Sequence, residues 1–348
     1  MQDEKKIISL LDLTREDLSA YVAAKGYPRF RAGQLFDAMT QGKKIEEITN
    51  LPKTFLADVE EYYPLFAIVK KLESKDGTKK YVFQYKDTEI VESVFMQYKY
   101  GNTLCVSTQV GCRMGCKFCA SGLFGLKRNL SSGEILEQII AVNRDNGGDA
   151  KKRAITNVVL MGSGEPLDNY ENVTRFLRLI GEERGLNISQ RNISLSTCGI
   201  VPNMRKLADD GFTVTLTVSL HASNDAVRKL NMPIAEKYSM EEVLDACRYY
   251  FDKTGRRIIF EYTLVDGVND KEEHIAELSK ILRGFSCHVN VIPLNYVKER
   301  GLKGSPVQRA HAFAEKLNGK GVSATVRRTL GADVGGACGQ LRNQLLQN

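Results

Sequence analysis

The feature that most constrains the fold is an alternation of apolar and amphipathic segments that starts near residue 103. Six short segments rich in Val, Ile, Leu and Thr are typical of buried strands: 103–108, 157–162, 192–197, 213–220, 258–265 and 288–295. Stretches with helical periodicity lie between them, at 132–145, 170–183, 240–253 and 271–283. Strands that alternate with helices form a parallel sheet with right-handed crossovers. The sequence therefore predicts an α/β fold, either curled into a partial barrel or doubly wound.

Polar side chains follow several of the predicted strands at the point where each strand ends. In both layouts, ligands bind at the carboxyl ends of parallel strands. The residues found there are Cys112, Cys116, Cys119, Gly164, Glu165, Ser196, Ser219, Leu220, His221 and Asn295. Taken alone, 162–166 would be an ordinary glycine-rich turn, and a histidine after a strand is more often a core residue. Their common position at one edge of the sheet favours a functional site there.

Three of the eight cysteines lie in one loop with the spacing C-x3-C-x2-C: Cys112, Cys116 and Cys119. A structural zinc site is closed by four ligands, and an ordinary iron–sulfur cluster also takes four thiolates. Three cysteines therefore leave one metal position for a ligand that is not protein. The alternative is a zinc site that recruits a distant fourth ligand such as Cys105.

The composition is that of a globular protein of about two domains, with 348 residues, of which 43% are hydrophobic and 26% charged. No apolar run approaches the ~18 residues of a membrane span, and residues 1–13 lack the layout of a signal peptide. We therefore expect a cytoplasmic protein without membrane contact, whose reduced thiols bind metal or catalyse. The net charge of +7 permits a nucleic-acid partner, although solubility alone also explains it.

Residues 1–65 are predicted to be helical and residues 66–97 to form β structure. Thr14 and Asp17 have the spacing of a capping box, and Pro52 suits the start of a later helix. The helical part contains several basic residues, and they can be explained as charged side chains on helix faces exposed to solvent. These residues are Lys25, Arg29, Arg31, Lys43, Lys44 and Lys53. Asp76-Gly77 predicts a hairpin turn. Glu92, on the strand that follows the hairpin, is expected to be a solvated carboxylate.

The cysteine loop after the first parallel strand, followed by Gly164-Glu165 after the second, resembles the radical S-adenosylmethionine (SAM) superfamily. That resemblance implies a partial (βα)6 barrel and one [4Fe–4S] cluster, held by three cysteines and by the amino and carboxylate groups of SAM. Over nearly the whole chain the sequence is similar to the RlmN/Cfr family of radical SAM RNA adenine methyltransferases. The segments that carry this similarity are FRAGQLFDAM, VESVFMQYKYGNTLCVSTQVGC, GEPLDNYENV, SLSTCGI, TVSLHA, MPI, LVDGVND, VIPLNY and GGACGQL.

The resemblance implies methylation of adenine C2 at position 2503 of 23S rRNA and at position 37 of tRNA. Pro166 and the stretch 293–295 are similar to the C2-methylating members, whereas the C8-methylating relatives usually have Ala after the glutamate. Ser163 departs from the family, in which many members have Met. The alternatives are C8 methylation of the same rRNA adenine and a non-enzymatic, zinc-containing RNA-binding protein. The implied partners are 23S rRNA, tRNA and an electron donor such as flavodoxin or ferredoxin, and the chain is expected to be a monomer.

The family chemistry explains why further cysteines are needed. C2 of adenine lies between two ring nitrogens and is too electron-poor to attack the methyl group of SAM, so a carbon radical must add to it. The resemblance implies that two SAM molecules are used per turnover, that Cys338 carries the methyl group and that Cys105 releases the product by forming a disulfide. Glu92 matches the proton acceptor of the family. Cys198, Cys247 and Cys287 are expected to be small buried hydrophobic residues.

The same resemblance assigns the SAM contacts and the division of the chain. Gly164 and Glu165 match the residues that bind the methionyl amino group. Ser196, Ser219, Leu220, His221 and Asn295 match those that contact the carboxylate, ribose and adenine of SAM. The expected units are a helical RNA-binding module at 1–65, a β-hairpin extension at 66–97, the radical SAM core at 98–330 and a tail at 331–348 that carries Cys338.

Overall fold

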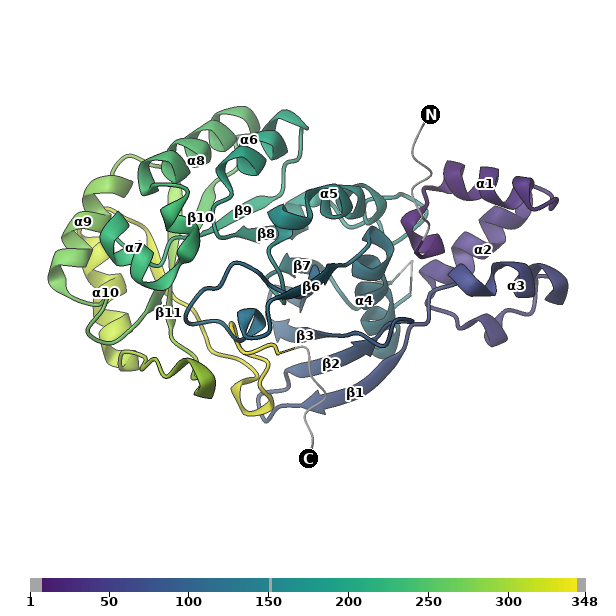
Figure 1. Ribbon diagram of the computed structural model, residues 1–348, viewed down its shortest axis with the longest axis horizontal. Coiled ribbons are helices and arrows are strands. Elements are labelled where there is room, and N and C mark those ends of the chain that lie inside the picture. Colours follow the sequence, from purple (N-terminus) through teal and green to yellow (C-terminus); the bar gives the residue numbers. More distant parts are fainter. Residues whose placement is uncertain (1–7, 150–151, 343–348) are drawn as a thin grey trace.

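The computed structural model describes residues 8–149 and 152–342, and its centre is one ten-stranded sheet (Figure 1). Three antiparallel strands form one side: β1 (Ile68–Glu73), β2 (Lys79–Gln84) and β3 (Ile90–Tyr98). Seven parallel strands continue the sheet: β4 (Gly101–Cys105), β7 (Asn157–Leu160), β8 (Ile193–Thr197), β9 (Thr215–Ser219), β10 (Ile258–Leu264), β11 (Cys287–Pro293) and β12 (Ala324–Val326). β1 and β12 are the two edges, so the sheet stays open.

The six predicted parallel strands correspond to β4 and β7–β11, and the α/β prediction is confirmed. β12 is a correction, because it adds a seventh parallel strand beside β11. Its three residues, Ala-Thr-Val, are too short to show a periodic pattern. The predicted turn at Asp76-Gly77 joins β1 and β2, with Gly77 at a φ of +83°.

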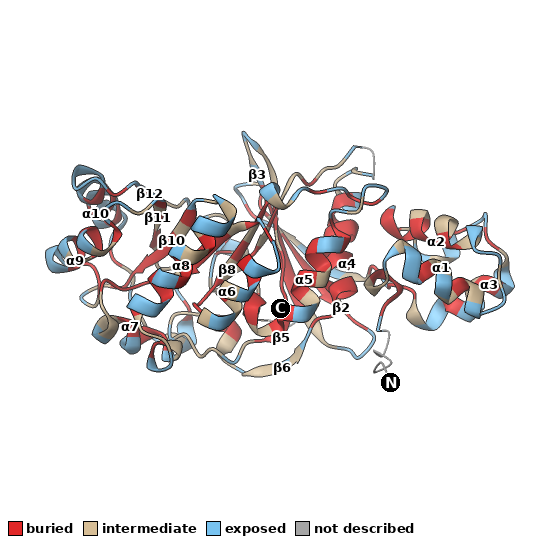
Figure 2. Cartoon of the chain, turned by 90° about the horizontal axis from the view of Figure 1, so that it is seen from above, coloured by how far each residue is buried: buried red, intermediate tan, exposed pale blue. Residues whose placement is uncertain are grey.

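Helices are arranged around the curved sheet (Figure 1). Those that follow the parallel strands are α4 (Ser132–Asp145), α5 (Tyr170–Leu179), α6 (Val201–Asp209), α7 (Asp225–Asn231), α8 (Met240–Thr254), α9 (Glu272–Leu282) and α10 (Val307–Gly319). Residues at the helix starts stabilise two of these helices. Ser131 and Glu134 form a capping box at α4, and Ser239 and Glu242 form one at α8. Buried residues follow the strands and the inner helix faces, as Figure 2 shows. No helix in the described part of the chain is long and apolar enough to cross a membrane.

The N-terminal part forms three helices, α1 (Arg15–Ala24), α2 (Phe30–Thr40) and α3 (Lys53–Val59), at one end of the molecule (Figure 1). The expected capping box is present, because the Thr14 hydroxyl accepts from the Asp17 amide at 3.1 Å. A short turn, η1 (Leu10–Asp12), docks this part on the barrel, where Asp12 accepts from the Gly133 amide at 2.6 Å. The hydrophobic core runs without a break from these helices into the barrel.

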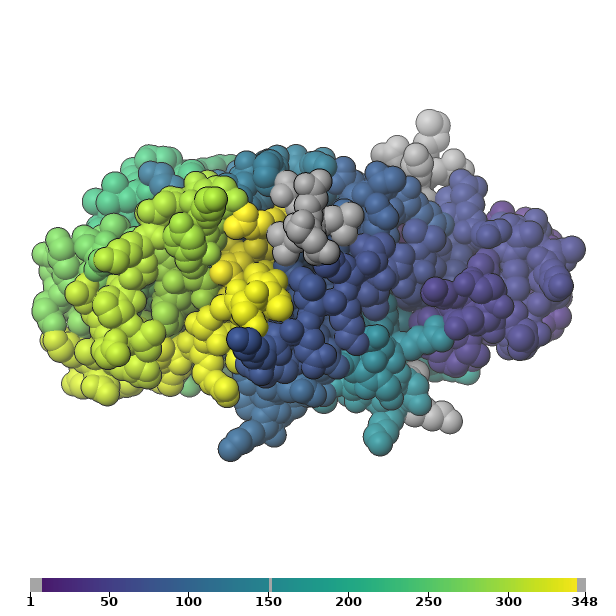
Figure 3. Space-filling model, turned by 90° about the horizontal axis from the view of Figure 1, so that it is seen from below, coloured from purple at the N-terminus to yellow at the C-terminus, as the bar shows by residue number. Residues whose placement is uncertain are grey.

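After β12 the chain crosses back to the antiparallel strands, and residues 327–342 form a C-terminal segment that lies against them (yellow beside dark blue in Figure 3). The amide of Gly331 donates to the Asp76 carboxylate at 2.9 Å, and the Ser74 hydroxyl donates to Asp333 at 2.5 Å. The segment is therefore attached to the tip of the β1–β2 hairpin. This route brings Cys338 from the end of the sequence to the carboxyl ends of the parallel strands.

Candidate functional site

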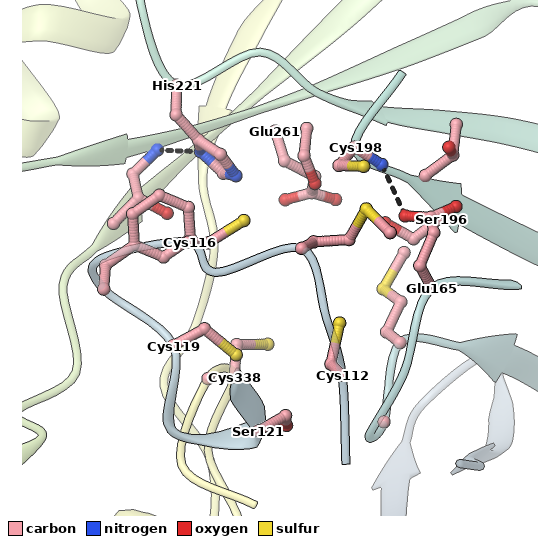
Figure 4. A pocket seen from close by; sticks show the side chains of 18 of the residues that line it. Cys112, Cys116, Cys119, Ser121, Glu165, Ser196, Cys198, His221, Glu261 and Cys338 are labelled. Carbon is pink, nitrogen blue, oxygen red and sulfur yellow. Dashed lines mark hydrogen bonds between the residues drawn. The ribbon is translucent and has the colours of Figure 1, made fainter. Parts of the chain in front are cut away.

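A cavity at the carboxyl ends of the parallel strands collects ten of the thirteen residues predicted for the site (Figure 4). They are Cys112, Cys116, Cys119, Gly164, Glu165, Ser196, Ser219, His221, Asn295 and Cys338. Leu220 does not line this cavity, because its side chain is fully buried in the hydrophobic core. Cys105 and Glu92 also lie outside it. Parallel strands end at one edge of a sheet, which is why residues so distant in sequence converge here.

The cysteine loop is held at its base by a two-stranded ribbon. β5 (Gln109–Gly111) pairs with β6 (Leu126–Asn129), and the Cys112 amide donates to the Gly125 carbonyl at 2.9 Å. Among the described residues, no three His, Cys, Asp or Glu side chains converge closely enough to chelate a single metal ion. A zinc ion holds its sulfur ligands about 2.3 Å from one centre, whereas each thiolate of a [4Fe–4S] cluster binds a different iron. A zinc site closed by four ligands would also need a fourth ligand from outside this loop.

The thiols of this loop lie in a poorly solvated place. Burial raises the pKa of Cys112 to about 12 and raises the pKa of Cys116 above its usual range. Both groups are therefore protonated at neutral pH unless a cation replaces the proton, as iron does when it binds a thiolate. The donor set of three thiols on one loop fits the three protein ligands of a cluster with an open fourth iron.

The turn that carries Glu165 packs tightly against the start of the cysteine loop. Gly164 has a φ of +107°, and a Cβ there would lie 2.6 Å from the Cβ of Gln109. One carboxylate oxygen of Glu165 accepts from the Leu167 amide at 3.1 Å, and the other accepts from the Cys198 amide at 2.8 Å. The bond to Cys198 is drawn in Figure 4. Burial raises the pKa of Glu165, and an ammonium group in the cavity would favour its charged form. This turn therefore fits the methionyl amino group of SAM.

His221 is held in an uncommon backbone conformation, with a φ of +53°. Its Nδ1 accepts from the Thr263 amide at 2.9 Å, which leaves Nε2 to carry the ring proton. Burial lowers the pKa of His221 to about 3, so the ring is neutral. The ring meets Phe118 of the cysteine loop edge to face at 4.6 Å. His221 therefore offers the cavity a neutral N–H donor.

Several residues of the cavity were not predicted. Glu261, in the middle of β10, binds Asn290 and Arg327 through Oε1 at 3.1 and 3.2 Å, and its buried Oε2 has no hydrogen-bond partner among the described residues. A charged residue within the apolar run IIFEYTL was the signal that could have identified it. Cys198 is buried as expected but also lines the cavity, whereas Cys247 and Cys287 lie in the core.

A second cavity adjoins the first and is lined by both Cys105 and Cys338. Cys338 is exposed and lines both cavities, while Cys105 on β4 lies deeper. Burial and then the neighbouring Cys338 raise the pKa of Cys105 to about 12. The backbone around Cys338 is fixed at two points, since Asn295 Nδ2 donates to its carbonyl at 3.0 Å and the Ala120 amide donates to the Gly339 carbonyl at 2.7 Å. Both thiols are free.

Glu92 lines neither cavity, and the expectation that it is a solvated carboxylate is wrong. It is buried and paired with Lys80 Nζ at 2.7 Å, and both side chains are only 2% exposed. Its other oxygen accepts from the Arg342 amide at 2.6 Å, and Lys80 also donates to the Gly335 carbonyl at 3.4 Å. The C-terminal segment covers this face of the antiparallel strands. The residues next to Glu92 in the sequence do not reveal this cover, because it comes from a distant part of the chain. The Lys80–Glu92 pair thus binds that segment on both sides of Cys338.

Comparison with known proteins agrees with this geometry. The model of the family described as "Radical SAM superfamily" matches residues 106–279. The chain is 48% identical to the "Probable dual-specificity RNA methyltransferase RlmN" of Clostridium tetani, over 98% of both chains. It is 50% identical to the protein of the same name from Clostridium botulinum strain Hall, over 96% of this chain and 98% of the relative.

A solved structure gives the same result. The structure described as a radical SAM methyltransferase from Sphaerobacter thermophilus superimposes with a TM-score of 0.92 and 43% identity, covering 97% of this chain and 100% of the other. These similarities extend beyond the barrel to the N-terminal helices and the C-terminal segment. The chain therefore belongs to the radical SAM superfamily and, within it, to the RlmN family of RNA methyltransferases.

Proposed function

We propose that this protein methylates C2 of adenine 2503 in 23S rRNA and C2 of adenine 37 in tRNA. The observation that carries the proposal is the cavity shared by Cys105 and Cys338, which adjoins the cavity of the cysteine loop. A methyltransferase that passes the methyl group of SAM directly to its substrate has no use for two free thiols that line one cavity. A methyl carrier and a resolving thiol account for both. Pro166 supports C2 over C8, because the residue after the glutamate resembles that of the C2-methylating members.

The residues present fit the implied cofactors. Cys112, Cys116 and Cys119 would hold the [4Fe–4S] cluster, and Gly164 with Glu165 would hold the amino group of SAM. Ser196, Ser219, His221 and Asn295 also line this cavity and are proposed to contact the remainder of SAM. When bound, the cluster and SAM supply the carbon radical that C2 of adenine requires. The Oε2 atom of Glu261 has no hydrogen-bond partner in the described part of the chain, and it offers the same cavity a further acceptor for a hydroxyl or amino group of a bound ligand.

The thiols and the carboxylate have separate proposed roles. Cys338 is exposed and lies between the two cavities, so it can receive a methyl group in one and present it in the other. Cys105 then forms a disulfide with Cys338 as the bond between the methyl carbon and the Cys338 sulfur breaks. Glu92 is proposed to accept the proton that leaves the adenine. Because Glu92 now binds Lys80 and the Arg342 amide, this role requires the C-terminal segment to shift.

The proposal extends to the partners. The basic side chains of residues 1–65 are proposed to contact RNA phosphates, and Lys25, Arg29, Lys44 and Lys53 are all exposed. We propose that the protein acts as a monomer in the cytoplasm, with a flavodoxin or ferredoxin as the electron donor.

The test is an anaerobic incubation of the reconstituted protein with SAM, a reductant, and either a 23S rRNA fragment that contains position 2503 or a tRNA. Nucleosides are then identified by mass spectrometry against 2-methyladenosine and 8-methyladenosine standards. We expect 2-methyladenosine from both RNAs. The 8-methyl isomer alone, or no methylated adenosine from an active cluster, would overturn the proposal.

Three cysteine variants test the assignment of the thiols. Cys105→Ala should accumulate RNA joined covalently to Cys338, because the radical can add but the product cannot be released. Cys338→Ala should never acquire an S-methyl group or bind RNA covalently. Cys287→Ala is the matched control, since Cys287 lies on β11 outside both cavities. Denaturing electrophoresis with and without nuclease distinguishes the three, and a Cys105→Ala protein free of RNA would contradict the assignment.

A further inference from the structure

A third hollow, of about 560 Å³, opens at the amino-terminal ends of the parallel strands, opposite the cavity of the cysteine loop. Its walls come from the turn between β3 and β4 and from the beginnings of β7, β8 and β10. Asn157 is the first residue of β7, and Asn192 directly precedes β8. None of the roles proposed above uses this hollow.

Two tyrosines form an aromatic platform at the mouth of the hollow. The rings of Tyr98 and Tyr100 stack at a centroid distance of 4.9 Å and an interplanar angle of 10°. Tyr100 is 77% exposed, so one face of the stacked pair remains open to solvent. An exposed aromatic face of this kind binds unpaired nucleic-acid bases by stacking, whatever their sequence.

Three cations surround the platform. Lys99, Arg191 and Arg328 line the hollow, and all three are exposed. None of them forms an ion pair with a carboxylate in the part of the chain that the structure describes. In proteins that bind single-stranded nucleic acids, cationic side chains bind the phosphates and a neighbouring aromatic side chain stacks on a base. Lys99, Arg191 and Arg328 together with the platform form such a combination. Deeper in the hollow, the fully buried Thr217 hydroxyl has no partner among the described residues.

The hollow adjoins the cavity of the two thiols. Met96, Tyr98, Met161, Arg327 and Arg328 line both spaces. A base that stacks on Tyr100 would therefore lie next to the cavity of Cys338 and Cys105. The cofactor and the substrate would approach Cys338 from opposite ends of the barrel.

We propose that this hollow is the entrance for the target nucleotide of the RNA. A flipped-out nucleotide stacks on the Tyr98–Tyr100 platform, and its flanking phosphates bind Lys99, Arg191 and Arg328. Enzymes that modify a base take it out of its stack, and a stacking surface beside the reactive thiol lowers the free energy of that state. This inference rests on the proposed function, because it takes RNA as the substrate and Cys338 as the group that meets it.

The test measures binding of a fluorescent single-stranded RNA around position 2503 to the cluster-containing protein by anisotropy, at several salt concentrations. Tyr100→Ala should weaken binding by about 5- to 150-fold, the range for loss of one base–aromatic stack. Tyr100→Phe keeps the ring and should bind nearly as the wild type does. Each of Lys99→Gln, Arg191→Gln and Arg328→Gln should reduce the slope of log affinity against log salt by about 0.7. Lys320→Gln is the control, because Lys320 is an exposed residue after α10, outside the hollow.

The failure of this inference differs from the failure of the proposed function. If the wild type makes no methylated adenosine, the proposed function fails and these variants are not needed to show it. If the wild type methylates RNA but Tyr100→Ala and the three cation variants bind RNA with unchanged affinity and salt slope, the entrance lies elsewhere. Unchanged RNA binding together with altered self-association of Tyr100→Ala would assign the platform to a second copy of the chain, which also overturns the inference.

Discussion

The buried Lys80–Glu92 pair permits a quantitative prediction. Lys80→Met removes the cation that lies 2.7 Å from the Glu92 carboxylate, and both side chains are only 2% exposed. Breaking a buried ion pair from one side typically costs about 3–5 kcal/mol, because an uncompensated charge stays in the interior. We therefore expect the free energy of unfolding of Lys80→Met to fall by that amount. The double variant Lys80→Met/Glu92→Gln removes both charges and should recover most of the loss.

The assay is urea unfolding of the anaerobic, cluster-containing protein, with the four proteins of the double-mutant cycle measured together. We expect a coupling energy of at least about 3 kcal/mol between the two positions, because the double variant should lose much less than the sum of the two single variants. Lys71→Met is the matched control: Lys71 lies on the neighbouring strand β1 and pairs with Asp145 at the surface, where a pair contributes about 0–1 kcal/mol.

The same variants should release the C-terminal segment, because Lys80 binds the Gly335 carbonyl and Glu92 binds the Arg342 amide. Alkylation of Cys338 by a thiol reagent should therefore be faster in Lys80→Met than in the wild type. A loss below about 1 kcal/mol, comparable to a surface pair, or strictly additive effects in the cycle, would refute the reasoning.

Three further predictions concern the site and its support. Gly164→Ala places a Cβ 2.6 Å from Gln109 at a φ of +107° and should lower SAM affinity at least about tenfold; unchanged affinity by calorimetry would contradict this. Cys116→Ala should lose most of its iron and its absorbance near 400 nm, whereas Cys247→Ala should keep both. Burial raises the pKa of Glu137 to about 8, so between its ordinary value near 4.5 and pH 8 the folded state holds a proton that the unfolded chain has lost. The free energy of unfolding should therefore fall as pH rises through that range, and Glu137→Gln should remove this decline in urea titrations.

Most residues of the cavity could be predicted from the sequence, because each of them directly follows a strand that is recognisable from its own few residues. Each parallel strand is an apolar run, and the residues after it, such as Cys112, Glu165, Ser196 and His221, must lie at one edge of the sheet once the strands are parallel. Glu261 was missed although it interrupts an apolar run, because it lies within a strand rather than after one. β12 was missed because a strand of three residues is too short to show an alternation of apolar and polar side chains.

The burial of Glu92 shows what a pattern along one strand cannot reveal. In the register of β2 and β3, Val82 lies opposite Glu92 and Lys80 lies opposite Val94, so Lys80 and Glu92 share one face. That face would be solvated in an isolated hairpin. It is buried here because residues 335–342 lie over it, and this contact spans about 250 positions of sequence.

The attachment of the C-terminal segment to the β1–β2 hairpin also determines the order in which the protein can mature on the ribosome. Ser74 and Asp333 are 259 positions apart, and at about 5–20 residues per second their synthesis is separated by about 13–52 s. During that interval the C-terminal segment that covers Lys80 and Glu92 has not yet been synthesised, and the strands of the barrel are still being added one by one. The cysteine loop, by contrast, is complete by residue 119. A nascent chain can therefore expose the three thiols proposed to hold the cluster well before Cys338 exists, and this proposed methyl carrier is the last of the proposed functional groups to be made.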